Sequence, residues 1–186
     1  MEQTANLAFF AQSAKMKFGC PNWQRLAQRR VEQKVDFSEA EFVALLADTS
    51  KTITGEINWE EDEDHSPAVE FRAEITSQTG YPLFVRGSFN PLAQTLTFAI
   101  IHASSRRIYA LDLGKDHHNP SCTNVGEKHK HRWTDQFRDK DAYVPDDITQ
   151  PAMNPVAVWK EFCAEAKITH NGVMAAPPAK QPSLFS

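Results

Sequence analysis

The most constraining feature of the sequence is a change in hydrophobic period near residue 52, from helical spacing to strict alternation. Alternation of apolar and polar residues places one set of side chains on each face of a β-strand. The alternating segments are 53–59, 69–75, 83–89, 95–101 and 108–113. Most connections between them are short turns, which favours antiparallel pairing of neighbours. We therefore expect a five-stranded, mostly antiparallel sheet over residues 52–113, with one face covered by helices.

The helices expected before the sheet lie within residues 4–48, where apolar residues recur at helical spacing. The clearest start signal is at Ser38. Ser38 and Glu41 have the spacing of a capping box, and Phe37 and Phe42 have the spacing of a hydrophobic staple. This pattern predicts that a helix begins directly after Ser38.

A last helix is predicted over residues 155–168, with Asn154 as N-cap and Pro155 at the first helical position. Between the sheet and this helix, segment 114–145 is rich in histidine and carries few regular signals. The expected fold class is α+β, with N-terminal helices and a C-terminal helix packed on the sheet.

Length and composition fit one globular domain, because the 186 residues are 41% hydrophobic and 24% charged. We expect a single domain over 1–172, followed by a flexible Pro-rich tail over 173–186. The net charge of −4 argues against an indiscriminate nucleic-acid coat protein. The three cysteines form no CxxC pair, and no signal peptide or long apolar run is present. These features predict reduced thiols, no membrane segment and a cytoplasmic location.

Histidines are concentrated in one part of the chain, because five of the seven lie between residues 102 and 131. Two of them form an HxH pattern at His129 and His131. If 127–133 is extended, the strand period places both imidazoles on one face. Two imidazoles can act as general acid and base near neutral pH, and His118 is a third candidate for this role.

The same histidines can instead bind a metal ion, and zinc is then the candidate cofactor. The candidate ligands are His117, His118, Cys122, His129 and His131, with Asp116 as a further oxygen ligand. A third interpretation is a polar strand or turn whose histidines are hydrogen-bonded or solvated and carry no chemistry. The HxH pattern leaves these three interpretations open.

Basic residues flank the histidines and can form a phosphate-binding surface. They are Arg106, Arg107, Lys128, Lys130 and Arg132. Histidines as acid and base, with Lys or Arg stabilising a pentavalent phosphate, are what metal-independent RNA cleavage requires. The first functional hypothesis is therefore a small, toxin-like ribonuclease that acts on RNA or single-stranded nucleic acid without a cofactor.

Residues 108–145 resemble a family of small, functionally uncharacterised bacterial proteins often found in mobile-element contexts. The matching residues follow an L-D-x-G pattern at 111–114, H-N-P at 118–120, H-x-H at 129–131 and D-K-x-A-Y at 139–143. Ser121–Cys122 stands where the family usually has Asp–Gly. The resemblance implies no activity. It implies that one constellation contains Asp112, His118, Asn119, His129 and His131.

The end of the chain resembles the pentapeptide that binds the bacterial sliding clamp of DNA polymerase. The residues that carry this resemblance are Gln181, Ser183, Leu184 and Phe185. A Pro-rich linker before them would allow Leu184 and Phe185 to reach a groove on a partner. The second functional hypothesis is therefore a non-catalytic phage or mobile-element interaction protein, an inhibitor or accessory factor that binds host machinery. Histidines around an open cleft would favour the enzyme, whereas buried histidines or a closed metal site would favour the interaction protein.

Overall fold

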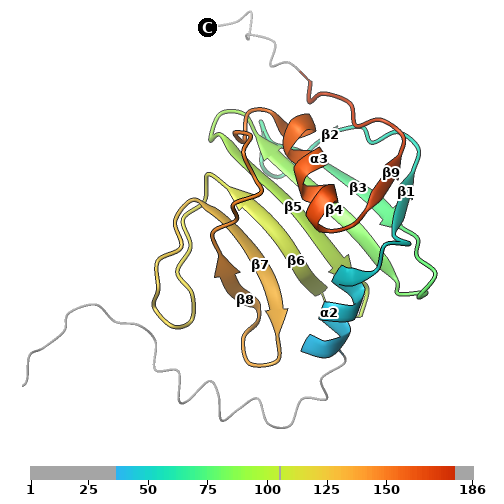
Figure 1. Cartoon of the computed structure of the whole chain (residues 1–186). Coiled ribbons are helices and arrows are strands. Elements are labelled where there is room, and N and C mark those ends of the chain that lie inside the picture. Colours follow the sequence, from blue (N-terminus) through green and yellow to red (C-terminus); the bar gives the residue numbers. More distant parts are fainter. Residues whose placement is uncertain (1–36, 105, 179–186) are drawn as a thin grey trace, which may run out of the picture. The chain divides into compact units, whose positions relative to one another are not determined.

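The computed structural model describes residues 37–104 and 106–178, which belong to one compact unit of the chain, 34–186. In chain order the elements are α2 (Glu39–Ala47), β1 (Thr52–Thr54), β2 (Glu60–Glu61), β3 (Val69–Ile75), β4 (Leu83–Asn90), β5 (Thr95–His102), β6 (Arg106–Leu113), β7 (Lys128–Thr134), β8 (Arg138–Tyr143), α3 (Pro155–Glu165) and β9 (Thr169–Asn171). Figure 1 shows α3 lying across one face of a large sheet. The helices predicted before residue 37 lie outside the described residues.

The large sheet contains seven strands in the order β2-β3-β4-β5-β6-β7-β8, and each neighbouring pair is antiparallel. The predicted α+β class and antiparallel sheet are confirmed, but the predicted count of five strands is wrong. The strands β7 and β8 come from segment 114–145, for which few regular signals were expected. Alternation is weak there because β7 carries histidines on one face and lysine on the other, and β8 is mostly charged.

The strand predicted over 53–59 is also different from the one observed. Only the short β1 forms, and it pairs with β9 in a separate two-stranded parallel sheet. Gly55 follows β1 with φ at 97°, in the left-handed region that favours glycine. The chain therefore turns at this residue, and the extended run ends early.

The capping box predicted at the start of α2 is confirmed. Ser38 Oγ accepts a hydrogen bond from the Glu41 amide at 3.2 Å, and the Ser38 amide donates to Glu41 Oε2 at 2.7 Å. The staple residues Phe37 and Phe42 are both buried. The Phe37 ring also meets Trp133 of β7 edge to face, with centroids 5.5 Å apart. These contacts attach α2 to the sheet.

Helix α3 begins at Pro155 as predicted, but it ends at Glu165 rather than at residue 168. Trp159 and Phe162 pack on Phe98 of β5, with ring centroids 5.2 and 5.6 Å away. Such aromatic contacts bury large apolar surfaces and stabilise the fold. They hold α3 on one face of the sheet. The polar residues of the opposite face are therefore not covered by this helix.

The domain extends past the predicted boundary at residue 172. The Ile57 amide donates to the Val173 carbonyl, and the Ala175 amide donates to the Ile57 carbonyl, both at 2.9 Å. Met174 is buried, and the Trp59 indole donates to the Ala175 carbonyl at 3.0 Å. Backbone pairing thus incorporates the start of the predicted tail into the domain. Residues 179–186, with the predicted clamp-binding peptide, lie outside the described residues.

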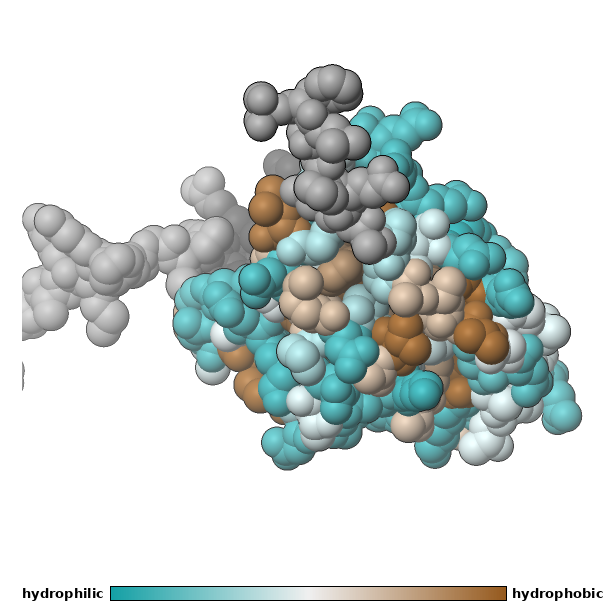
Figure 2. Space-filling model, turned by 90° about the horizontal axis from the view of Figure 1, so that it is seen from above, coloured by the Kyte–Doolittle hydropathy of each residue, from teal (hydrophilic) through white to brown (hydrophobic). Residues whose placement is uncertain are grey.

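The surface of the described residues carries few large hydrophobic side chains, and none of the helices there is long and apolar enough to cross a membrane. The exposed ones are Val43, Leu92, Val144, Met153 and Val173. On the face seen in Figure 2, hydrophobic residues form small patches among hydrophilic ones. Hydrophobic residues exposed in this way are ordinary and do not by themselves mark a docking surface.

Candidate functional site

The register of β6 and β7 brings three of the expected residues together. Asp112 of β6 lies opposite His129 of β7, and Ala110 lies opposite His131. Residues two apart on a strand share a face, so both imidazoles stand beside the Asp112 carboxylate. Lys130, between them, contacts Glu165 of α3, which places the imidazoles on the sheet face opposite α3. The face assignment made from the sequence is therefore confirmed.

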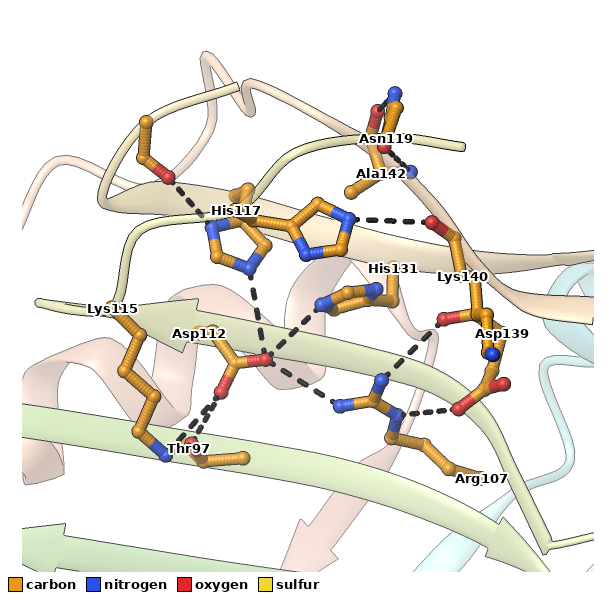
Figure 3. Close-up of polar contacts among 12 residues, drawn as sticks. Thr97, Arg107, Asp112, Lys115, His117, Asn119, His131, Asp139, Lys140 and Ala142 are labelled. Atoms are coloured by element: carbon orange, nitrogen blue, oxygen red, sulfur yellow. Dashed lines mark hydrogen bonds and ion pairs between the residues drawn. The ribbon is translucent and has the colours of Figure 1, made fainter. Parts of the chain in front are cut away.

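A third imidazole comes from the loop between β6 and β7. The loop folds back on itself, with the Val125 amide donating to the His117 carbonyl at 2.9 Å. Its His117 ring stacks on His129 with centroids 4.9 Å apart and meets His131 edge to face at 4.6 Å. Figure 3 shows His117 above His131 and Asp112. One ring nitrogen from each of the three histidines lies within 4.8 Å of the other two.

The side chain of Asn119 attaches this loop to the edge strand β8. Its amide nitrogen donates to the Ala142 carbonyl, and its amide oxygen accepts from the Ala142 amide, both at 2.8 Å. This pair of bonds imitates the pairing of a neighbouring strand. Two residues before Asn119, His117 is thereby held over β7 (Figure 3).

Backbone carbonyls decide which ring nitrogens carry protons in two of the imidazoles. His129 Nδ1 lies 2.9 Å from the Gly126 carbonyl oxygen, and His117 Nε2 lies 3.2 Å from the Lys140 carbonyl oxygen. A carbonyl oxygen only accepts, so each of these nitrogens donates. In the neutral rings the lone pairs are therefore on His129 Nε2 and His117 Nδ1.

The Asp112 carboxylate is buried and accepts hydrogen bonds from His131 and Thr97. His131 Nε2 lies 3.2 Å and His129 Nε2 3.8 Å from its Oδ2, and Thr97 donates to its Oδ1. Burial raises the pKa of Asp112, but hydrogen bonds from His131 and Thr97 and the charge of Lys115 outweigh burial. The net pKa is well below its usual range. Asp112 is therefore a carboxylate at neutral pH.

Two of the imidazoles beside it, those of His117 and His129, favour the neutral form. Burial lowers the pKa of His117 and of His129, and the charge that His131 would carry lowers both further. His129 and His131 are only 2% and 3% exposed. Among the described residues, His131 Nδ1 has no hydrogen-bond partner, so the contact of this ring with Asp112 is made by Nε2. Neutral imidazoles are the form that binds metal ions.

Two sequence candidates lie outside this cluster. The His118 side chain is 60% exposed, and its nearest charged group is Asp116, 3.9 Å away. The constellation implied by the resemblance is thus corrected, because His117 takes the place expected for His118. Cys122 lies in the same loop but does not belong to the group of three converging ligands. Both His117 and His118 were candidate metal ligands in the sequence. The sequence could not distinguish them because the two residues lie in a loop, where the alternation of a strand does not fix the direction of side chains.

The predicted basic surface is divided between the two faces of the sheet. Lys130 is fully buried and paired with Glu165 and, at 2.5 Å, with Asp147. Lys128 donates to the Ile148 carbonyl at 3.2 Å. Lysine side chains on the α3 face cannot meet a phosphate bound at the histidines.

The arginines of the predicted basic surface are also separated. Arg132 is paired with Asp141 at 2.9 Å, and Arg106 is an exposed residue at the start of β6. Arg107 is the predicted basic residue that lies beside the histidine cluster, 3.5 Å from Asp112. Lys115, which the sequence did not indicate, is the second cation at this carboxylate, at 3.7 Å.

These observations define a class: an α+β domain on one antiparallel sheet, with three converging imidazoles and a buried carboxylate on the face opposite the helix. The chain belongs to a family of unknown function, DUF6978, whose model matches residues 37–168. The matched range contains every residue of the cluster. Comparisons with curated proteins and with solved structures give no match.

Proposed function

We propose that this protein binds a transition-metal ion, with Zn²⁺ as the best fit, through His117, His129 and His131. The observation that carries the proposal is the pair of carbonyl contacts at Gly126 and Lys140. Histidines that bind metals usually donate the other ring N–H to a carbonyl or carboxylate, which orients the ring and fixes its tautomer. Three neutral imidazoles form a donor set that suits zinc.

Asp112 supplies the natural fourth ligand. Zinc bonds of about 2.0–2.2 Å in a tetrahedron place neighbouring ligand atoms about 3.4 Å apart. Asp112 Oδ2 lies 3.2 Å from His131 Nε2 and 3.8 Å from His129 Nε2, which is close to this spacing. Metal binding at His131 Nε2 would require its proton to move to Nδ1, which has no hydrogen-bond partner among the described residues. Four protein ligands are typical of structural zinc sites, which contribute directly to folding.

Metal-independent RNA cleavage by His118, His129 and His131 stays a prediction. The burial of His129 and His131 and the distance of His118 from them support the metal proposal instead. A metal-stabilised domain agrees with the second hypothesis, an interaction protein. Sliding-clamp binding by the C-terminal peptide also stays a prediction, and a pull-down with and without residues 181–186 tests it.

Metal titration tests the proposal directly. The purified protein, stripped with EDTA and dialysed, is titrated with Co²⁺, whose visible absorption reports tetrahedral coordination, and with Zn²⁺ in competition. We expect one ion per chain for the wild type and for His118→Ala, the matched control from the neighbouring position. His117→Ala and His129→Ala should bind at least about tenfold more weakly. Equal binding by all four proteins, or none by the wild type, contradicts the proposal.

The same samples test the nuclease hypothesis. Labelled RNA is incubated with wild type and His131→Ala, with and without EDTA. Cleavage that survives EDTA and disappears in the variant would favour acid–base chemistry over a metal role.

A further inference from the structure

Two solvent-accessible cations lie at the same carboxylate as the imidazoles. Arg107 Nη1 is 3.5 Å from Asp112 Oδ2, and Lys115 Nζ is 3.7 Å from Asp112 Oδ1. Arg107 Nε also pairs with Asp139 at 3.0 Å. The side chains of Arg107 and Lys115 are 31% and 48% exposed, so both reach solvent, whereas Asp112, His129 and His131 are buried. Figure 3 shows both pointing toward Asp112.

The charges of this group balance only while no metal is bound. Arg107 and Lys115 offset Asp112 and Asp139. A divalent ion among the imidazoles adds two positive charges and takes much of the Asp112 charge for itself. The two cations then face a positive centre at short range, and solvent screens this repulsion only in part. An anion beside them would relieve it.

A groove on the same face of the sheet reaches Thr97, the neighbour of Asp112 on β5. The groove has a volume of about 480 Å³, and its walls include Thr95, Thr97 and Ala99 of β5. Thr97 lies directly opposite Asp112 in the sheet, and its hydroxyl accepts a hydrogen bond from Lys115 at 2.7 Å. Arg86 also lines the groove, but Glu70 neutralises it at 2.9 Å. Asp62 adds a negative charge to the same walls, so the cations left for an anion are Arg107 and Lys115, beside Asp112.

We infer that the metal-loaded centre binds an oxyanion of the phosphate type, with one oxygen toward the metal and the others toward Arg107 and Lys115. This inference rests on the proposed metal site. A guanidinium binds two phosphate oxygens at once, whereas an ammonium acts as a point charge. The phosphate group can belong to free phosphate or to a nucleic-acid backbone.

Phosphate titration of the Co²⁺-loaded protein tests the inference. Inorganic phosphate is added while the visible spectrum of Co²⁺ and the ³¹P linewidth are recorded. We expect saturable changes in both for the loaded protein and no binding by the metal-free protein. Lys115→Gln and Arg107→Gln should keep Co²⁺ and bind phosphate about tenfold more weakly each. Arg72→Gln, which removes an exposed arginine paired with Glu74 on β3, is the matched control and should behave as wild type.

The outcomes separate the two proposals. If Co²⁺ does not bind, the metal site fails. If Co²⁺ binds but phosphate changes neither signal, or binds equally without metal, only the oxyanion inference is overturned. Because Lys115 is half exposed, its variant tests the charge without disturbing the core. A short single-stranded RNA titrated in parallel identifies the source: tighter binding than phosphate supports a phosphodiester ligand, and equal or weaker binding supports free phosphate.

Discussion

The two faces of β7 satisfy their polar side chains in different ways. Toward α3, the Lys130 ammonium meets the carboxylates of Asp147 and Glu165, and the hydroxyls of Tyr109 and Tyr143 also donate to Glu165. The charges and hydrogen bonds there are complete without any ligand. Residues one position away along the same strand point to the other face, where the polar groups are imidazoles and a carboxylate.

On the imidazole face, basic ring nitrogens converge beside a carboxylate. His117 and His129 give their protons to carbonyls and turn their basic nitrogens toward one another. Asp112 adds a negative charge at the base of the cluster. The comparison teaches that a complete ion-pair network maintains the fold, whereas basic nitrogens that converge beside a carboxylate provide the donor set that the metal proposal requires.

The largest loss of stability is expected from Lys130→Met. Removing one partner of a fully buried pair costs about 3–5 kcal/mol. Because Asp147 and Glu165 are partly exposed and can recover hydration, we expect about 2–3 kcal/mol in urea unfolding of the metal-free protein. Zinc binding by the folded variant should be unchanged. Arg132→Gln, which removes an exposed pair with Asp141 on the same strand, should cost less than about 1 kcal/mol. Equal losses would mean that burial does not distinguish the two pairs.

Zinc should stabilise the imidazole face by a similar amount. At a free concentration of about one hundred times Kd, a ligand that binds only the folded state adds about 2.7 kcal/mol to the free energy of unfolding. We expect this gain, measured by urea unfolding with and without Zn²⁺, in the wild type and in His118→Ala. It should be absent from His117→Ala at the same zinc concentration. A gain of equal size in that variant would show that the metal binds elsewhere.

Asn119→Ala should have a smaller effect on stability and a clear one on metal affinity. The variant loses both hydrogen bonds to Ala142, at about 0.5–1.5 kcal/mol each, so we expect a loss of about 1–2 kcal/mol. Because the loop then holds His117 less firmly, zinc affinity should fall about tenfold. Ser121→Ala, in an exposed part of the same loop, should change neither quantity. Unchanged zinc affinity in Asn119→Ala would show that the position of His117 does not depend on the hydrogen bonds between Asn119 and Ala142.

The smallest expected effect is on the pH dependence of the metal-free protein. The folded pKa values of His117 and His129 are lowered, so the unfolded chain binds more protons as pH falls below about 6.5. Stability should therefore fall between pH 7.5 and 5.5, as measured by urea midpoints. His117→Asn should reduce this fall, and His118→Asn should not. The folded pKa of Asp112 is well below its usual range, so this carboxylate also stabilises the folded state at neutral pH. Its contribution to stability is lost only at a pH far below this window. Identical pH profiles for the two variants would show that the histidine cluster does not cause the fall in stability.

Local sequence patterns were sufficient for several elements of this protein. The capping box at Ser38 and Glu41 correctly predicted where α2 begins, because its hydrogen bonds join residues only three apart. The alternation along 128–132 correctly separated the histidine face from the lysine face, because side-chain direction in a strand depends only on residue parity. Apolar alternation likewise identified β3, β4, β5 and β6.

The tertiary structure decided what these faces contact. Asp112 meets His129 only through the register of two strands, and His117 rather than His118 joins them because Asn119 bonds to Ala142, 23 residues away. The strands β7 and β8 were missed as parts of the sheet because their partners, rather than an apolar period, hold them there. By itself, the sequence determined which side chains share a face. Contacts between residues far apart in the chain determined which of them form the site, because such contacts leave no periodic pattern in the sequence.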